Sequence, residues 1–107
     1  MHNCNEGVYN LKTTEGVYIG QTSNYVTRIK YHKTPKSKIG KMGAVIEEVT
    51  KFEMPGSTKL EREVYEQYLI KKSGIKNLIN TRNPMGGRKE LFNRMIDNVI
   101  EKFNLPR

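Results

Sequence analysis

Two short runs of β-forming residues near the start of the chain restrict its fold more than any other feature. Residues 8–11 and 17–19 are rich in β-branched and aromatic side chains, and the five residues between them have the character of a turn. The pattern predicts a β-hairpin over residues 6–21. If the two strands pair across the turn, Tyr9 and Tyr18 can lie on one face of the sheet. Phenol rings on a sheet are usually packing groups, so by themselves these two indicate no chemistry.

A short helix and a third strand are expected next. The polar residues 22–24 offer N-cap side chains for a helix over residues 25–33, which Pro35 ends. Residues 36–48 fit a helical period only in part, because Gly40 and Gly43 weaken it. Residues 49–54 alternate between apolar and polar over part of their length, which predicts a third strand.

Two longer helices are predicted in the second half of the chain. Thr58 and Glu61 have the spacing of a capping box, which opens a helix that ends near residue 72. Residues 75–83 read as a loop that holds Leu78 and Ile79 inward. Residues 88–105 carry apolar side chains at three- and four-residue spacing, as in an amphipathic helix that faces the core or a partner.

The element order β-β-α-β-α-α predicts one α+β domain over residues 1–107, with residues 1–6 as an N-terminal extension. Its three-stranded antiparallel or mixed sheet would be flanked by helices. A chain of 107 residues is the size of one domain, and it holds no apolar stretch of about 20 residues that would span a membrane. The N-terminus lacks the apolar region of a signal peptide. One cysteine, Cys4, excludes an intramolecular disulfide framework and a cysteine-rich zinc site.

The distribution of charge indicates a polyanionic partner. The formal net charge is +8, and two segments, residues 16–46 and 67–89, each hold six basic residues and no acidic one. Glutamates lie between and outside these segments, which suits a polyanion held on both sides of a carboxylate. The alternative is a solvated basic face with no ligand. The candidate nucleic-acid-binding residues are Lys30, Lys33, Lys36, Lys71, Lys72, Arg82 and Arg88.

Four further side chains are candidates for chemistry. Arg28 and His32 are four residues apart on the first predicted helix, so they lie on one face. A guanidinium is suited to a phosphate, and an imidazole can orient or move a proton. Glu63 and Glu66 on the capped helix are surface charges by default, but a carboxylate among basic segments is also what Mg²⁺ needs beside a phosphate.

The order of these residues resembles the GIY-YIG nuclease family. The resemblance covers residues 7–83 and rests on Gly7-Val8-Tyr9, Tyr18-Ile19-Gly20, Arg28 with His32, Glu66 before Leu69-Ile70-Lys71, and Asn80. Valine takes the place of the isoleucine in the first motif, and the short gap between the tyrosines suggests a tight hairpin. The family fold, a small three-stranded sheet with helices, agrees with the expected element order.

The resemblance implies a role for each of these residues. Tyr9 and Tyr18 would lie beside the attacking water, and one of them would act as the general base. Arg28 would bind the scissile phosphate and His32 would assist the tyrosine or the leaving group. Glu66 rather than Glu63 would hold one Mg²⁺ or Mn²⁺ ion. Asn80 would position the phosphate backbone, with Asn77 and Asn83 as alternatives.

Residues 80–88 resemble the GIY-YIG domains at the C-termini of bacterial polymorphic toxins. This implies a monomeric antibacterial toxin domain, secreted as part of a larger protein and acting in the cytoplasm of the target cell; otherwise a cytoplasmic nuclease is expected. An acidic immunity protein would inhibit it. The substrate would be DNA, slightly favoured over RNA such as tRNA. The alternatives from other classes are a non-catalytic nucleic-acid-binding module and a protein-interaction module that docks through the last helix.

Overall fold

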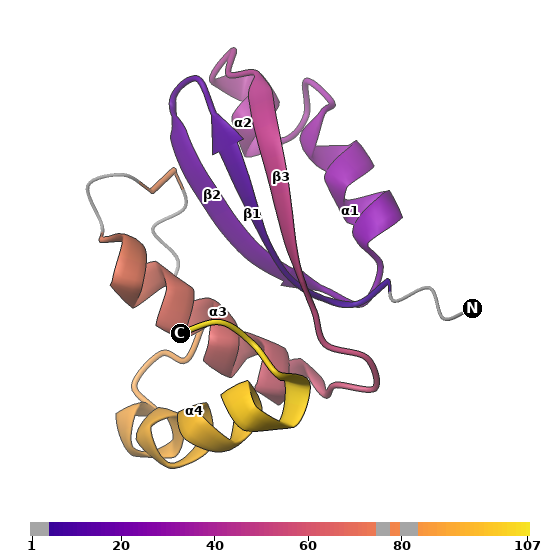
Figure 1. The fold of residues 1–107 in the computed structure, drawn as a ribbon. Helices are drawn as coiled ribbons and strands as arrows, with labels where there is room; N and C mark the ends of the chain where they lie inside the picture. The colour runs from indigo at the N-terminus through magenta and orange to yellow at the C-terminus, as the bar shows by residue number, and fades with distance from the viewer. Residues whose placement is uncertain (1–4, 75–77, 80–83) are drawn as a thin grey trace.

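Three antiparallel strands form the sheet of this α+β domain (Figure 1). They are β1 (Gly7–Thr13), β2 (Gly16–Thr22) and β3 (Ile46–Glu53), in the spatial order β2-β1-β3. The structure, a computed structural model, describes residues 5–74, 78–79 and 84–107. The predicted hairpin is confirmed, and its turn is tighter than the five residues expected, because β1 and β2 pair as far as Thr13 and Gly16.

The four described helices are α1 (Tyr25–His32), α2 (Lys38–Lys41), α3 (Lys59–Ser73) and α4 (Lys89–Phe103). The side chain of Asn24 accepts a hydrogen bond from the backbone N–H of Thr27 at the start of α1. The predicted capping box is confirmed, since Thr58 and Glu61 each accept from the other's backbone N–H. Helix α4 is slightly shorter than predicted.

The element order differs from the predicted one over residues 36–48, where the structure has a short helix, α2, before the third strand. Ser37 caps the four-residue helix α2 by accepting a hydrogen bond from the N–H of Gly40. A Cβ at Gly40 would lie 2.0 Å from the carbonyl oxygen of Thr34, so the close packing of this turn requires glycine. The third strand begins at Ile46, earlier than predicted, because pairing with β1 extends it.

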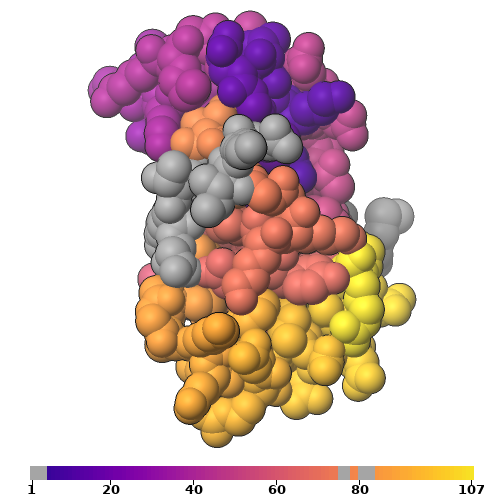
Figure 2. Space-filling model, turned by 90° about the vertical axis from the view of Figure 1, so that its left-hand side faces the viewer, coloured from indigo at the N-terminus to yellow at the C-terminus, as the bar shows by residue number. Residues whose placement is uncertain are grey.

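The sheet carries an apolar core on each face. Val8 and Ile19 belong to a cluster with α3 and α4, whereas Tyr9 and Leu11 belong to a second cluster with α1 and α2. This follows from the alternation of side chains along a strand. The apolar face of α4 packs in the first cluster through Phe92, Val99 and Ile100, so its periodicity reflects core packing. Figure 2 shows α3 and α4 stacked below the hairpin.

The residues after α3 return to the sheet at the edge of β2. Leu78 forms a parallel bridge with Val17, and the N–H of Ile79 donates to the carbonyl of Val17 over 2.8 Å. Leu78 packs against the first core and Ile79 belongs to the second, as predicted for inward residues. No helix in the described parts of the chain is both long and apolar enough to cross a membrane.

Candidate functional site

Tyr9 and Tyr18 lie on the same face of the hairpin, as predicted. In the β1–β2 ladder Tyr9 is opposite Gly20 and Tyr18 is opposite Leu11, which makes the tyrosines diagonal neighbours. Their rings stack with centroids 6.3 Å apart and 12° between the planes. Tyr9 is buried, with 1% of its surface exposed, whereas Tyr18 is half-buried. Tyr18 is therefore the phenol that solvent reaches more readily.

Gly20 makes room for the Tyr9 ring. A Cβ built on Gly20 would lie 2.5 Å from Oη and 2.6 Å from Cζ of Tyr9, closer than carbon atoms approach in proteins. The backbone of Gly20 is not in the left-handed region, so the requirement for glycine here is one of space. The Tyr9 ring therefore packs against β2 at a position that has no side chain.

His32, the last residue of α1, joins the two tyrosines. Its Nε2 lies 2.8 Å from the Tyr9 hydroxyl, and its ring centroid is 4.5 Å from that of Tyr18. The imidazole is 2% exposed, and burial, together with the positive charge of Arg28, lowers its pKa to about 4. His32 is therefore neutral at pH 7.

Arg28 lies one helical turn before His32, on the face of α1 that points to the tyrosines. Its guanidinium hydrogen-bonds Tyr9, which is the main reason that its pKa is raised, and it interacts with Tyr18 as well. Since a guanidinium only donates, the Tyr9 oxygen accepts from Arg28. The tautomer of the imidazole sets which group donates in the bond between Tyr9 and Nε2 of His32. Arg28 remains partly exposed, so it can also reach a bound anion.

Glu66 is a buried carboxylate on α3 whose charge acts on Tyr9. The side chain is 3% exposed, and it is close enough to Tyr9 for its charge to act on the phenol. Burial is the main cause of the raised pKa of Tyr9; Glu66 raises it further, and the hydrogen bond from Arg28 lowers it. Tyr9 is consequently a protonated phenol at neutral pH.

The oxygen donors at this site fit a hard divalent cation. Mg²⁺ binds through one or two protein carboxylates and takes its other ligands from water and phosphate oxygens, which one buried carboxylate allows. Across residues 5–74, 78–79 and 84–107 no three His, Cys, Asp or Glu side chains are grouped as metal ligands. Asn80, with the alternatives Asn77 and Asn83, lies outside the described residues.

The predicted nucleic-acid-binding residues fall into two groups. Lys30, Lys33 and Lys36 are exposed on α1 and the turn that follows it. The other three described residues have intramolecular contacts at the junction of α3 and α4. Lys71 lies 4.5 Å from the centroid of the Phe92 ring, Lys72 donates to the carbonyl of Arg107, and Arg88 is 3.9 Å from Glu63. Arg82 lies outside the described residues.

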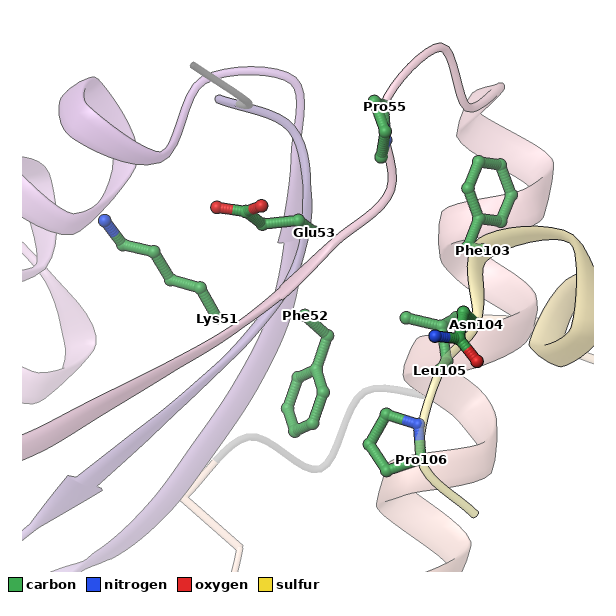
Figure 3. A pocket seen from close by; sticks show the side chains of 8 residues that line it. All are labelled: Lys51, Phe52, Glu53, Pro55, Phe103, Asn104, Leu105 and Pro106. Carbon is green, nitrogen blue, oxygen red and sulfur yellow. The ribbon is translucent and has the colours of Figure 1, made fainter. Parts of the chain in front are cut away.

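Of the cavities in the described part of the chain, one adjoins this cluster and another lies away from it. One of about 280 Å³ is lined by His32, Lys33, Gly40 and residues 44–46, and so adjoins the imidazole. Another, of about 530 Å³, lies between β3 and the segment after α4 and is lined by Phe52, Phe103 and Pro106 among others (Figure 3). The second contains none of the candidate residues.

The sequence analysis missed a buried polar group on α3. Arg62 is 8% exposed and bonds to Gln21 and Ser57. The available signal was its position four residues before Glu66, which places both side chains on one face of the helix.

No protein-family model, curated protein or solved structure matches this chain. The candidate site therefore rests on its own geometry: two tyrosines, an arginine, a histidine and a glutamate from the hairpin, α1 and α3.

Proposed function

We propose that this protein is a metal-dependent endonuclease of the GIY-YIG type, which hydrolyses phosphodiester bonds in nucleic acid. The observation that carries the proposal is the interaction of Tyr9 with Arg28, His32 and Glu66, residues that lie far apart in the sequence. Their order along the chain is that of the GIY-YIG motifs, and the antiparallel sheet with flanking helices agrees with that fold.

The geometry supports a separate role for each tyrosine. Tyr9 is buried and held by His32, so in this proposal it positions the cluster. Tyr18 is more accessible and stacks on Tyr9, so the attacking water is assigned to Tyr18. As the phenolate, Tyr18 takes the water's proton and becomes a neutral phenol while the new P–O bond forms. The bond between phosphorus and the leaving oxygen then breaks.

Arg28 and Glu66 complete the proposed reaction. Arg28 binds a non-bridging oxygen of the phosphate and offsets the negative charge that grows in the transition state. Glu66 would hold Mg²⁺ or Mn²⁺, which when bound stabilises charge on the leaving oxygen. His32, neutral at pH 7, keeps the Tyr9 phenol in place through their hydrogen bond.

The substrate would lie over α1 and α2. The exposed bases there include Lys30, Lys33, Lys36, Lys38 and Lys41, and no acidic residue occurs between residues 16 and 46. Lys71, Lys72 and Arg88 contribute less, because each already contacts another part of the protein. Lysine contacts to phosphates are independent of sequence, so this face favours nucleic acid in general. DNA stays slightly favoured over RNA.

The biological setting follows from the resemblance of residues 80–88 alone. In this proposal the domain is an antibacterial toxin, delivered as part of a larger secreted protein and active in the target-cell cytoplasm. Its inhibitor would be an acidic immunity protein, because electrostatic complementarity accelerates the capture of a basic protein.

The proposal is tested by incubating the purified protein with plasmid DNA, single-stranded DNA and total tRNA, with Mg²⁺, with Mn²⁺ or with EDTA. We expect cleavage of at least one substrate with a divalent ion and none with EDTA. Glu66→Gln should reduce the rate about 10²- to 10³-fold. Glu63→Gln, on the same helix but paired with Arg88, is the matched control and should retain activity.

Equal cleavage by the wild type and Glu66→Gln would contradict the proposal. Salt-sensitive binding without metal-dependent cleavage of any of the three substrates would instead identify a non-catalytic nucleic-acid-binding module.

A further inference from the structure

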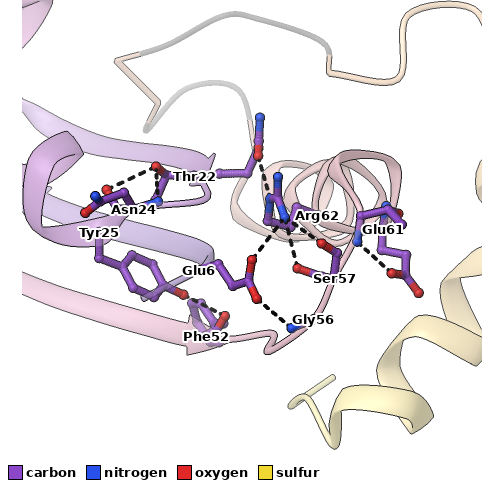
Figure 4. Close-up of polar contacts among 11 residues, drawn as sticks. Glu6, Thr22, Asn24, Tyr25, Phe52, Gly56, Ser57, Glu61 and Arg62 are labelled. Atoms are coloured by element: carbon purple, nitrogen blue, oxygen red, sulfur yellow. Dashed lines mark hydrogen bonds and ion pairs between the residues drawn. The ribbon is translucent and has the colours of Figure 1, made fainter. Parts of the chain in front are cut away.

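Arg62 forms a buried polar network between α3 and the hairpin (Figure 4). Its Nε donates to Oε1 of Gln21 over 2.9 Å. Its Nη1 donates to the carbonyl oxygen of Ser57 over 2.9 Å and to the Ser57 hydroxyl over 3.1 Å. The same nitrogen lies 3.8 Å from the carboxylate of Glu6. We refer to Arg62, Gln21, Ser57 and Glu6 as the Arg62 clamp.

Glu6 extends the clamp to the turn that precedes α3. Its Oε1 accepts a hydrogen bond of 2.5 Å from the N–H of Gly56, and its backbone carbonyl accepts one of 3.0 Å from the N–H of Met54. One carboxylate thus contacts both the turn before α3 and the arginine on α3. Backbone groups of this turn bond to both charged side chains: the N–H of Gly56 donates to Glu6, and the carbonyl of Ser57 accepts from Arg62.

Three members of the clamp, Glu6, Gln21 and Arg62, lie close in sequence to a candidate catalytic residue. Glu6 precedes β1, which carries Tyr9, and Gln21 follows Gly20 on β2, which carries Tyr18. Arg62 lies one helical turn before Glu66 on α3. The clamp therefore joins the three elements whose side chains must meet at the site.

The apolar contacts of α3 do not by themselves fix where the helix lies along the sheet. Val64 and Leu69 pack in the core shared with Val8 and Ile19, and hydrophobic contact has no direction. Hydrogen bonds from a planar guanidinium are directional, and they form only at one position of the helix. A buried cation is also costly to leave unpaired, so a displaced helix would lose more than it gains.

We infer that Arg62 is a positioning residue, which fixes the place of α3 along the hairpin and so sets the position of the Glu66 carboxylate relative to Tyr9 and Tyr18. The inference rests on the proposed function for its effect on catalysis. Its structural part, the placement of α3, stands on the contacts of the clamp.

The test compares Arg62→Met, Arg62→Lys and the exposed control Lys59→Met. Methionine retains much of the volume of arginine and leaves no buried charge. Two quantities are measured: the Mg²⁺ concentration for half-maximal cleavage, well below each variant's unfolding temperature, and the distance between Glu66 Cδ and Tyr9 Oη in crystal structures.

For Arg62→Met we expect a half-saturating Mg²⁺ concentration about 10- to 100-fold higher, with partial recovery at high Mg²⁺. The distance from Glu66 to Tyr9 should change by about 1 Å, a displacement large enough to reduce a rate strongly. Arg62→Lys, which keeps a charge but loses the planar fork, should be intermediate. Lys59→Met should match the wild type.

An unchanged Mg²⁺ requirement and an unchanged distance in Arg62→Met would overturn the inference. If Arg62→Met does not fold, Gln21→Met removes only the contact to β2, and it is expected to raise the Mg²⁺ requirement by a smaller factor. If the wild type cleaves nothing, the proposed function fails, and the crystallographic distance alone decides whether Arg62 places α3.

Discussion

The hydroxyl of Tyr9 lies 2.8 Å from Nε2 of His32, in the interior of the domain and across 23 positions of sequence. Burial keeps the imidazole neutral at pH 7 by lowering its pKa to about 4, and burial likewise raises the pKa of the phenol. Both groups are therefore uncharged, and each satisfies a buried polar atom of the other. The bond joins β1 to α1 and fixes the ring on which Tyr18 stacks.

Protonation of His32 should destabilise the fold in acid. The pKa of His32 is about 4 in the folded protein and about 6.5 in the unfolded chain, so between these values the unfolded chain binds more protons. The stability associated with neutral His32 is fully present above pH 6.5 and is lost as the pH falls through 4. At about 1.4 kcal/mol per pKa unit, the loss amounts to about 3 kcal/mol.

Chemical denaturation at a series of pH values checks this prediction. The free energy of unfolding of the wild type should fall between pH 6.5 and 4.5, and that of His32→Gln should fall less steeply over the same interval. Parallel curves for the two proteins would show that His32 is not the group responsible. Glu61, whose pKa is lowered in the folded protein, is present in both proteins, so its contribution to the pH dependence of stability is the same in the two curves.

Substitution of Gly20 should disturb the Tyr9–His32 bond. In Gly20→Ala the new methyl group would lie 2.5 Å from the Tyr9 oxygen, so the ring must move. Overpacking of this kind costs about 1–3 kcal/mol, and we expect a comparable loss of stability in thermal or chemical denaturation. Gly87→Ala is the matched control, since nothing lies within 4 Å of the added Cβ, and a similar loss there would refute the steric argument.

Replacement of Arg28 by lysine should separate charge from geometry. Arg28 hydrogen-bonds Tyr9, interacts with Tyr18 and lies 5.4 Å from the centroid of the Tyr31 ring. A lysine ammonium keeps the charge but not the planar fork, so the cleavage rate should fall about 10- to 100-fold. Single-turnover cleavage with saturating enzyme measures the effect. Arg94→Lys, at an exposed position on α4 outside the candidate site, should leave the rate unchanged; full activity of Arg28→Lys would exclude a bidentate role.

The salt dependence of binding should distinguish the two groups of basic residues. In a Glu66→Gln background, which prevents cleavage, Lys30→Gln with Lys33→Gln removes two exposed charges. The slope of log K against log salt should become shallower by about two if each lysine contacts one phosphate of a duplex. Lys71→Gln with Lys72→Gln should change the slope by less than one, because these lysines contact Phe92 and Arg107. Fluorescence anisotropy with labelled DNA measures both slopes. A larger change in slope for the Lys71 and Lys72 variant than for the Lys30 and Lys33 variant would indicate that nucleic acid binds at α3 and α4 instead.

The predictable part of the fold consists of features that depend on neighbouring residues. The hairpin, the cap at Thr58 and the amphipathic α4 all have local patterns, and each is present. The predicted first residue of β3 was wrong, because the length of a strand depends on the strand it pairs with. The sequence left α2 ambiguous, because Gly40 weakens the helical period around it. The α+β class was correct despite these errors.

The candidate site likewise has some features that depend on neighbouring residues and others that depend on residues far apart in the sequence. The sequence alone determined that Arg28 and His32 share a helix face and that the hairpin can align Tyr9 with Tyr18, because both relations follow from the period of one element or one turn. Only the tertiary structure decided that the charge of Glu66 acts on Tyr9, that Arg62 is buried in a clamp, and which lysines contact other parts of the protein. These relations depend on how α1 and α3 pack against the sheet, and that packing is set by apolar burial and directional hydrogen bonds between residues far apart in the chain.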